Sequence, residues 1–209
     1  LKKIREYESD IPISIDTRHA VVAEAALKAG ADIVNDVSGG TFDPHMLSTV
    51  SEFNASMILM HMRGTPETMQ TMTQYEEQGI ILDVAAELRE RSQEAEKAGI
   101  HRWQQVLDPG IGFAKDLNGN LMLLKHYGRL QSMLGNIPFL LGTSRKGFIG
   151  KVTGETVAKE RDYGTLASCI AALCLSKDSD SGFSILRVHN VKGIKQGTLV
   201  FDAICGAKN

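Results

Sequence analysis

The sequence predicts an α/β fold, a TIM-type (β/α)8 barrel of which six of the eight βα units are present. Two observations predict it. Six short apolar runs alternate with longer stretches of helical period, and most runs are nearly continuous in Ile, Val, Leu and Met. Such runs are typical of parallel strands buried on both faces. In addition, polar side chains follow the end of every run, which suits a barrel with its site at the C-terminal rim.

The six expected strands are residues 12–17, 31–37, 55–62, 103–108, 138–144 and 184–190. An open doubly wound sheet is the alternative for repeated βα units. Such a sheet would gather its polar residues at one switch point, whereas here they follow all six strands. No G-x-G-x-x-G follows any strand, so the dinucleotide-binding fingerprint is absent from the sequence. The barrel is therefore the favoured architecture.

Helical period extends over residues 21–29 and 82–98, each followed by a glycine where a left-handed C-cap fits, Gly30 and Gly99. Residues 1–10 resemble the end of a helix, and residues 178–182 a polar loop. Because a full barrel has eight strands, we expect the first two βα units to be absent and two sheet edges to be unpaired. The whole chain, residues 1–209, is expected to form one incomplete barrel domain.

Composition restricts the partners. The 209 residues carry a net charge of −2, which gives no general positive field for nucleic acid. The longest apolar stretch of helical type, near residues 165–175, is shorter than the roughly 20 residues that span a bilayer, so we expect a core helix and no membrane partner. The sequence begins with no secretory signal pattern.

The three cysteines are Cys169, Cys174 and Cys205, and they form no CxxC pair. This sparse, odd set suits a reducing compartment, so we expect a cytoplasmic or organellar protein that is not secreted. Cys169 and Cys174 lie in an apolar helical pattern and are expected to be buried as small hydrophobic side chains.

Carboxylates and an amide follow three of the strands. Asp16 ends the first strand and would face the barrel mouth, or it would cap the helix that begins near His19. Asn35 and Asp36 end the second strand, and either could instead be a turn residue. Asp108 is the strongest candidate, because Pro109 and two glycines follow it and shape a rigid loop that allows close approach. The alternative is that this Asp-Pro-Gly segment is simply a turn.

Basic residues follow the last two strands. A stretch of small and basic residues begins at Gly142 and continues through Ser144, Arg145 and Lys146. It suits the binding of an anion or a carbonyl group. The alternative is a solvated turn without a binding role. Arg187 and His189 alternate along the sixth strand and point to one face, which suits a diphosphate unless this is an exposed strand end.

Other chemistries find little support. His61 follows the third strand, and a role in the site and a purely structural role are equally well supported. The order of residues does not establish a Ser-His-Asp triad. The histidines lack zinc-binding spacing, which disfavours a catalytic zinc.

Together these segments resemble dihydropteroate synthases. The matching segments occur in the order of that family and cover nearly the whole chain: 14–17, 30–37, 59–64, 107–113, 144–146 and 187–190. The resemblance implies a (β/α)8 barrel with a pterin in its mouth. It implies condensation of 6-hydroxymethyl-7,8-dihydropterin diphosphate with p-aminobenzoate, giving 7,8-dihydropteroate and diphosphate in folate biosynthesis, and it makes the protein a sulfonamide target.

The resemblance also implies roles for individual residues. Those that bind the pterin would be Asp16, Asn35, Val37, Ile58, Met60, Asp108, Phe113, Gly142, Lys146 and Arg187. Those around p-aminobenzoate would be Ser144, Lys146, Phe113 and Pro66. Diphosphate would be held by Arg187 and His189. The residues taking part in the reaction itself would be Asp108, Lys146, Arg187 and His189.

By the same resemblance the enzyme uses Mg²⁺ and forms a homodimer. The family's metal contact lies in a first-strand segment that this sequence does not contain, so no metal ligand is assigned here. Two alternatives differ in class. One is a methyltetrahydrofolate-binding methyltransferase domain, which would depend on a corrinoid. The other is a non-catalytic pterin-binding module, which would bind pterin without turnover.

Overall fold

Six parallel strands form one sheet in the order of the sequence. A computed structural model describes residues 1–65, 67–75, 79–135, 137–176 and 184–207. The strands are β1 (Ser14–Asp16), β2 (Ile33–Asp36), β3 (Ser56–Met60), β4 (Gln105–Asp108), β5 (Phe139–Leu141) and β6 (Ser184–Leu186). All six expected strands are confirmed. Each is shorter than expected, although single backbone hydrogen bonds continue past some strand ends, as from the Thr17 N–H to the Asn35 carbonyl at 3.1 Å.

Nine α-helices lie in the described part of the chain. They are α1 (Lys2–Tyr7), α2 (Ala20–Lys28), α3 (Met46–Glu52), α4 (Ile80–Lys97), α5 (Leu117–Lys125), α6 (Tyr127–Met133), α7 (Gly147–Thr153), α8 (Asp162–Leu175) and α9 (Val191–Gly206). Short 3-10 turns span Met69–Thr71, Arg102–Gln104 and Ala158–Arg161. The expected ends of α2 and α4 are confirmed, because Gly30 and Gly99 directly follow their C-caps, each with a φ of 98°.

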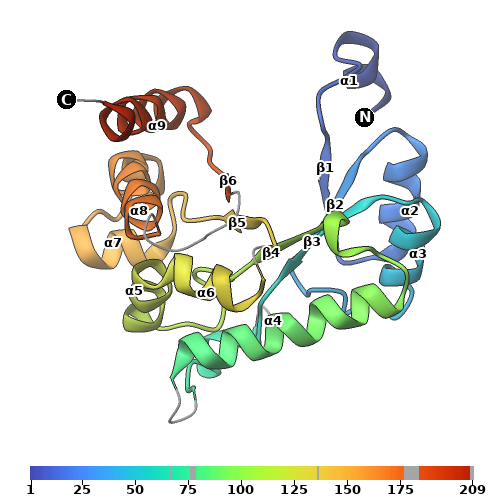
Figure 1. Ribbon diagram of the computed structural model, residues 1–209, viewed down its shortest axis with the longest axis horizontal. Helices are drawn as coiled ribbons and strands as arrows, with labels where there is room; N and C mark the ends of the chain where they lie inside the picture. The colour runs from blue at the N-terminus through green and yellow to red at the C-terminus, as the bar shows by residue number, and fades with distance from the viewer. Residues whose placement is uncertain (66, 76–78, 136, 177–183, 208–209) are drawn as a thin grey trace.

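The helices form an arc around the curled sheet (Figure 1). The arc runs from α2 and α3 through α4 to α8 and α9, and it is open between α9 and α1. In the residues described, β1 and β6 each pair with a single neighbour, so they are the sheet edges. The molecule is thus a six-unit portion of a TIM-type barrel.

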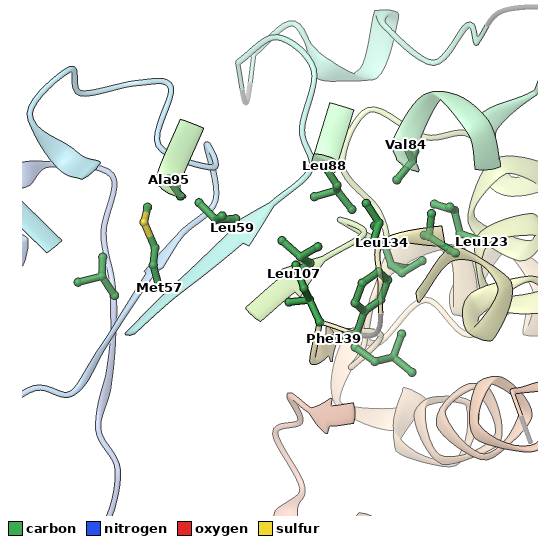
Figure 2. Close-up of a cluster of buried hydrophobic side chains, with 14 of the residues drawn as sticks. Met57, Leu59, Val84, Leu88, Ala95, Leu107, Leu123, Leu134 and Phe139 are labelled. Atoms are coloured by element: carbon green, nitrogen blue, oxygen red, sulfur yellow. The ribbon is translucent and has the colours of Figure 1, made fainter. Parts of the chain in front are cut away.

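The hydrophobic core lies between the sheet and the helices. Side chains alternate between the two faces of a strand, and apolar side chains on the outer face of the four central strands are fully buried: Val34, Met57, Leu59, Leu107, Phe139 and Leu141. Figure 2 shows Leu59 beside Ala95 of α4, and Leu107 and Phe139 among Leu88 and Leu134. Burying each such large side chain contributes about 1.5–3 kcal/mol. This packing fixes the strands and leaves the inner face for the site.

One expectation about the cysteines is wrong. Cys169 on α8 is buried, but Cys174 on the same helix is exposed, as is Cys205. Five positions along a helix are about 140° around its axis, so Cys174 cannot share the buried face of Cys169. Among the described helices, none combines the length and apolar character that crossing a membrane requires. The expected polar loop at 178–182 lies outside the described residues.

Candidate active site

The C-terminal ends of the strands bring polar side chains together on the inner face. The backbone register places Asp16 beside Asn35 and Asn35 beside Ile58. It also places Met60 beside Asp108. Because paired residues of parallel strands point to the same face, these side chains share one surface. Asn35, Ile58, Met60 and Asp108 are all at most 7% exposed there.

Asp16 and Arg187 form an ion pair between the two edge strands, which we call the edge pair. Arg187 Nη2 donates to Asp16 Oδ2 over 2.6 Å, and Asn35 Nδ2 donates to Asp16 Oδ1 over 2.5 Å. The two charged side chains are 52% and 55% exposed. Asp16 does not cap α2: that helix begins after His19, and Asp43 accepts a hydrogen bond from the Ala20 N–H. The helix-cap alternative for Asp16 is therefore wrong.

Asp108 and Lys146 face each other across Gly142, and we call them the central pair. A Cβ added at Gly142 would lie 3.7 Å from Lys146 Nζ and 3.9 Å from Asp108 Oδ2. Asp108 is buried, and its Oδ1 accepts from the Gly110 N–H at 2.7 Å. Lys146 Nζ donates to the Ile111 carbonyl and lies 4.8 Å from the centre of the Phe113 ring. Both the turn role and the mouth position of Asp108 are thus observed.

Burial and opposite charge act against each other in the central pair. Burial raises the pKa of the Asp108 carboxyl, although the positive charge of Lys146 favours its ionised form. Burial likewise lowers the pKa of Lys146, while Asp108 opposes that change. Charges whose surroundings disfavour ionisation mark functional sites more often than exposed ion pairs do.

A cavity of about 860 Å³ opens on the inner face between β1 and β6. Its apolar lining comes from strand residues that include Ile33, Ile58, Leu140 and Ile185. Asp16, Asn35 and Arg187 provide polar groups in the same lining. Apolar walls with a few convergent polar groups are typical of small-molecule sites.

The side chains of the basic stretch after β5 point in two different directions. Ser144 Oγ lies 2.8 Å from His189 Nδ1 and accepts from the His189 N–H at 3.2 Å, which joins the loops after β5 and β6. Arg145 instead turns toward α8 and holds both carboxylate oxygens of Asp162, at 2.7 and 3.0 Å. Its φ of 59° accompanies this reversal. Arg145 is therefore structural.

Two further polar candidates also point away from the mouth. Asp36 accepts from the N–H groups of Ser38 and Gly40 at 2.8 and 2.9 Å, so it takes the turn role and leaves Asn35 for the inner face. His61 points outward to α4, where its Nε2 lies 3.1 Å from Glu87 Oε2. Val37 and Phe113 are half-buried beside the rim. Pro66 lies outside the described residues.

The buried charge behind the site was not predicted from the sequence. Lys115 is only 4% exposed, and Arg63 donates to Glu87 over 2.9 Å and lies 4.2 Å from the centre of the Tyr75 ring. The only local signal was a lysine at the end of the glycine-rich loop after Asp108. Its burial depends on β3 and α4, which are distant in the sequence.

The sequence profile of the family described as pterin binding enzyme matches residues 1–189. The chain belongs to the pterin-binding enzymes. Within this family it is 43% identical to the dihydropteroate synthase of Synechocystis sp. over 201 residues, which are 94% of this chain and 65% of that protein. It is 41% identical to the folic acid synthesis protein fol1 of Pneumocystis carinii, covering 98% of this chain and 27% of the relative.

Solved structures of relatives support the assignment of this chain to the pterin-binding enzymes. Thermus thermophilus dihydropteroate synthase in complex with 6HMPPP superposes with a TM-score of 0.85 at 33% identity, over 96% of this chain and 75% of that chain. The chain spans less than two thirds of the Synechocystis relative and about a quarter of the fungal one. The predicted fold class and family resemblance are thereby confirmed.

Proposed function

We propose that this chain is the pterin-binding part of a dihydropteroate synthase, a transferase. It would join 6-hydroxymethyl-7,8-dihydropterin diphosphate to p-aminobenzoate and release 7,8-dihydropteroate and diphosphate. The observation that carries the proposal is the central pair, a buried carboxylate and an ammonium that converge on one point beside Gly142. The Thermus thermophilus relative has been crystallised with 6HMPPP and with 4-aminobenzoate, which supports both substrates.

A pterin complements the central pair chemically. Its amino-pyrimidine edge presents adjacent N–H donors, which the carboxylate of Asp108 can accept, while Lys146 can donate to the ring carbonyl. Each such charge-assisted hydrogen bond contributes about 1.5–3 kcal/mol. Asp16 and Asn35 add acceptors on the same face. Val37, Ile58, Met60 and Phe113 would form the apolar walls, and Arg187 would lie over the ring.

The second substrate and the leaving group would occupy the rim. Ser144 and Lys146 would contact p-aminobenzoate together with Phe113. Arg187 and His189 would hold the diphosphate, with Ser144 orienting His189 through the 2.8 Å contact. The methylene C–O bond breaks, diphosphate leaves with the electron pair, the arylamine nitrogen bonds to the methylene carbon, and the amine proton passes to solvent. These residues therefore orient the reactants and neutralise the leaving charge.

Magnesium is expected from the family resemblance, but the described residues do not form a site that fits it. No group of three or more His, Cys, Asp and Glu side chains that could hold an ion occurs among them. Asp16 is already paired with Arg187, and Asp108 accepts from the Gly110 N–H. The expectation that the family's metal ligand lies in another segment stays a prediction.

The proposal includes a homodimer and a reducing compartment. Helix α9 leaves Leu199, Val200 and Ile204 57–70% exposed, and a second copy could cover this apolar surface. Relatives from Arabidopsis thaliana and Pisum sativum carry the word mitochondrial in their names, which keeps an organellar location among the alternatives to the cytoplasm.

The proposal is tested by calorimetric titration of the chain with pterin diphosphate and Mg²⁺, followed by an assay for dihydropteroate after p-aminobenzoate is added. We expect binding that Asp108→Asn weakens by about 10- to 150-fold, the effect of one charge-assisted hydrogen bond. Asp202→Asn, an exposed carboxylate on α9, is the matched control and should bind as the unmodified chain does.

The outcomes separate the functions. Binding with dihydropteroate formation supports the proposal in full. Binding without turnover would instead favour a non-catalytic pterin-binding module. A folded chain that binds no pterin diphosphate would overturn the proposal.

A further inference from the structure

Lys115 is a buried lysine behind the proposed pterin site. It lies in the loop between β4 and α5 and is 4% exposed. Its Nζ donates to the Phe113 carbonyl at 2.8 Å and lies 2.9 Å from His61 Nδ1. Lysine is seldom buried without a specific partner, because removing its ammonium from water is costly. These contacts fix Lys115 at one place beneath the loop.

Charged groups from several elements face Lys115. Asp108 and Lys146 act on it from the site, and Glu87 and Arg63 act from α4 and from the segment after β3. Burial lowers the pKa of Lys115 to about 7, although the carboxylates of Asp108 and Glu87 favour its charged form. Near neutral pH, Lys115 therefore changes charge close to Asp108.

His61 and Glu87 support Lys115 on the side away from the mouth. Burial lowers the pKa of His61, which favours a neutral ring. An ammonium can only donate, so His61 Nδ1 accepts from Lys115, and the ring proton lies on Nε2. That atom is 3.1 Å from Glu87 Oε2, without the alignment of a full hydrogen bond. Burial acts to raise the pKa of Glu87, but the nearby His61 ring and the hydrogen-bonded Arg63 guanidinium outweigh it and hold that pKa at about 2.

The same loop directly follows Asp108 and contains Phe113, which are two residues of the proposed site. Gly110 has a φ of 67°, and a Cβ there would lie 2.0 Å from the His61 carbonyl oxygen, so the loop is pressed against the end of β3. Tyr75 donates to the Ala114 carbonyl at 2.9 Å. Lys115 thus holds the loop from behind, with its Nζ between the Phe113 carbonyl and His61 Nδ1.

We propose that Lys115 is a positioning residue for the site: its ammonium orients Phe113 and Asp108 toward the pterin, and its proton is coupled to pterin binding. This inference rests on the proposed function. A charged Lys115 favours the Asp108 carboxylate that would accept from the pterin. Raising the pH removes the charge from Lys115, so pterin affinity should fall as the pH rises through the neutral range.

The test compares Lys115→Met, which removes the charge, with Lys115→Arg, which keeps it at every accessible pH. Lys125→Met, an exposed lysine on α5, is the matched control. The probe is 6-hydroxymethyl-7,8-dihydropterin, chosen because it carries no phosphate that titrates in this range. Its dissociation constant is measured by calorimetry from pH 6 to 8.5 for each protein.

Between pH 6 and pH 8.5, we expect the affinity of the unmodified chain for the probe to fall about tenfold. This corresponds to the loss of one favourable charge that contributes about 1.4 kcal/mol. Lys115→Met should bind weakly and without pH dependence, and Lys115→Arg tightly and without pH dependence. The control should follow the unmodified chain. A Lys115→Met protein with normal affinity and a normal pH profile overturns the inference.

A second measurement needs no variant to fold. In ¹³C-lysine-labelled, ligand-free protein, the Lys115 side-chain signal should titrate near pH 7 and move to higher pH when the probe binds. Titration only above pH 9, or no movement with the probe, contradicts the inference. Complete absence of probe binding to the unmodified chain would instead overturn the proposed function.

Discussion

Two pairs of opposite charges lie at the same end of the sheet, but their surroundings differ. The edge pair joins Asp16 and Arg187 directly at 2.6 Å, and both side chains are more than half exposed. In the central pair, Asp108 is 5% exposed and its pKa is raised by burial. Asp108 and Lys146 lie on either side of Gly142.

The difference indicates where ligand-binding energy is concentrated. Exposed ion pairs contribute little, because water and salt screen them. Groups shielded from water interact more strongly with charged or polar groups of a ligand. The central pair is therefore expected to contribute most of the pterin affinity, and the edge pair a smaller part of it.

The largest expected effect is on Lys146. Lys146→Met removes the ammonium of the central pair and leaves Asp108 without its strongest favourable charge. We expect pterin diphosphate to bind about 10- to 150-fold more weakly, the loss of one charge-assisted hydrogen bond. Calorimetry measures the change, with Lys151→Met on the exposed surface of α7 as control. Equal affinities for the two variants would remove the central pair from the site.

Gly142→Ala tests the space inside the central pair. The added methyl would make only ordinary contacts, 3.7 Å from both Leu140 Cδ2 and Lys146 Nζ, so the free energy of unfolding should hold or rise slightly. Because the methyl occupies the place where the pterin would meet both charges, we expect pterin diphosphate to bind about tenfold more weakly. One extra methyl-sized group in a binding pocket typically has an effect of this size. Gly147→Ala, with open space around it, is the control in both calorimetry and urea unfolding.

Asp108→Asn should stabilise the ligand-free fold at neutral pH. A carboxyl whose folded-state pKa is raised contributes its stability below its unfolded pKa of about 3.9 and loses it as the pH rises through the folded-state pKa. Asparagine carries no such penalty and can still accept from the Gly110 N–H. Urea unfolding at pH 7 and at pH 4 measures this. The advantage of the variant should be larger at pH 7, and a less stable variant at pH 7 would contradict it.

The smallest expected effect is the coupling within the edge pair. A double-mutant cycle of Asp16→Asn and Arg187→Met should give about 0–1 kcal/mol of coupling in the free energy of unfolding. Because both side chains are exposed, 1 M NaCl should remove most of it. Coupling well above 1 kcal/mol that resists salt would show that the edge pair behaves like a buried one.

The sequence was sufficient for the strands and for the face of the sheet that carries chemistry. Buried parallel strands are read from short apolar runs, and the residues that end these runs lie at one rim because the strands are parallel. Asp16, Asn35 and Arg187 meet there, as do Ser144 and His189. Their assigned binding roles remain predictions.

Neighbouring polar residues were harder to separate. Asn35 and Asp36, like Arg145 and Lys146, are adjacent in sequence, and composition does not say which faces the mouth. The register of β2 against β1 turns Asn35 inward, and the contact with Asp162 draws Arg145 toward α8. These choices depend on partners that lie 17 or more positions away.

By itself, then, the sequence determined the order of the six strands, the rim that holds the polar groups and the family resemblance, because these follow from local patterns along the chain. Only the tertiary structure decided that Lys115 is buried behind Asp108, that Cys174 and not Cys169 is the exposed cysteine of α8, and that the central pair converges on Gly142. Burial and electrostatic surroundings arise when distant segments pack together, and no single segment contains that information.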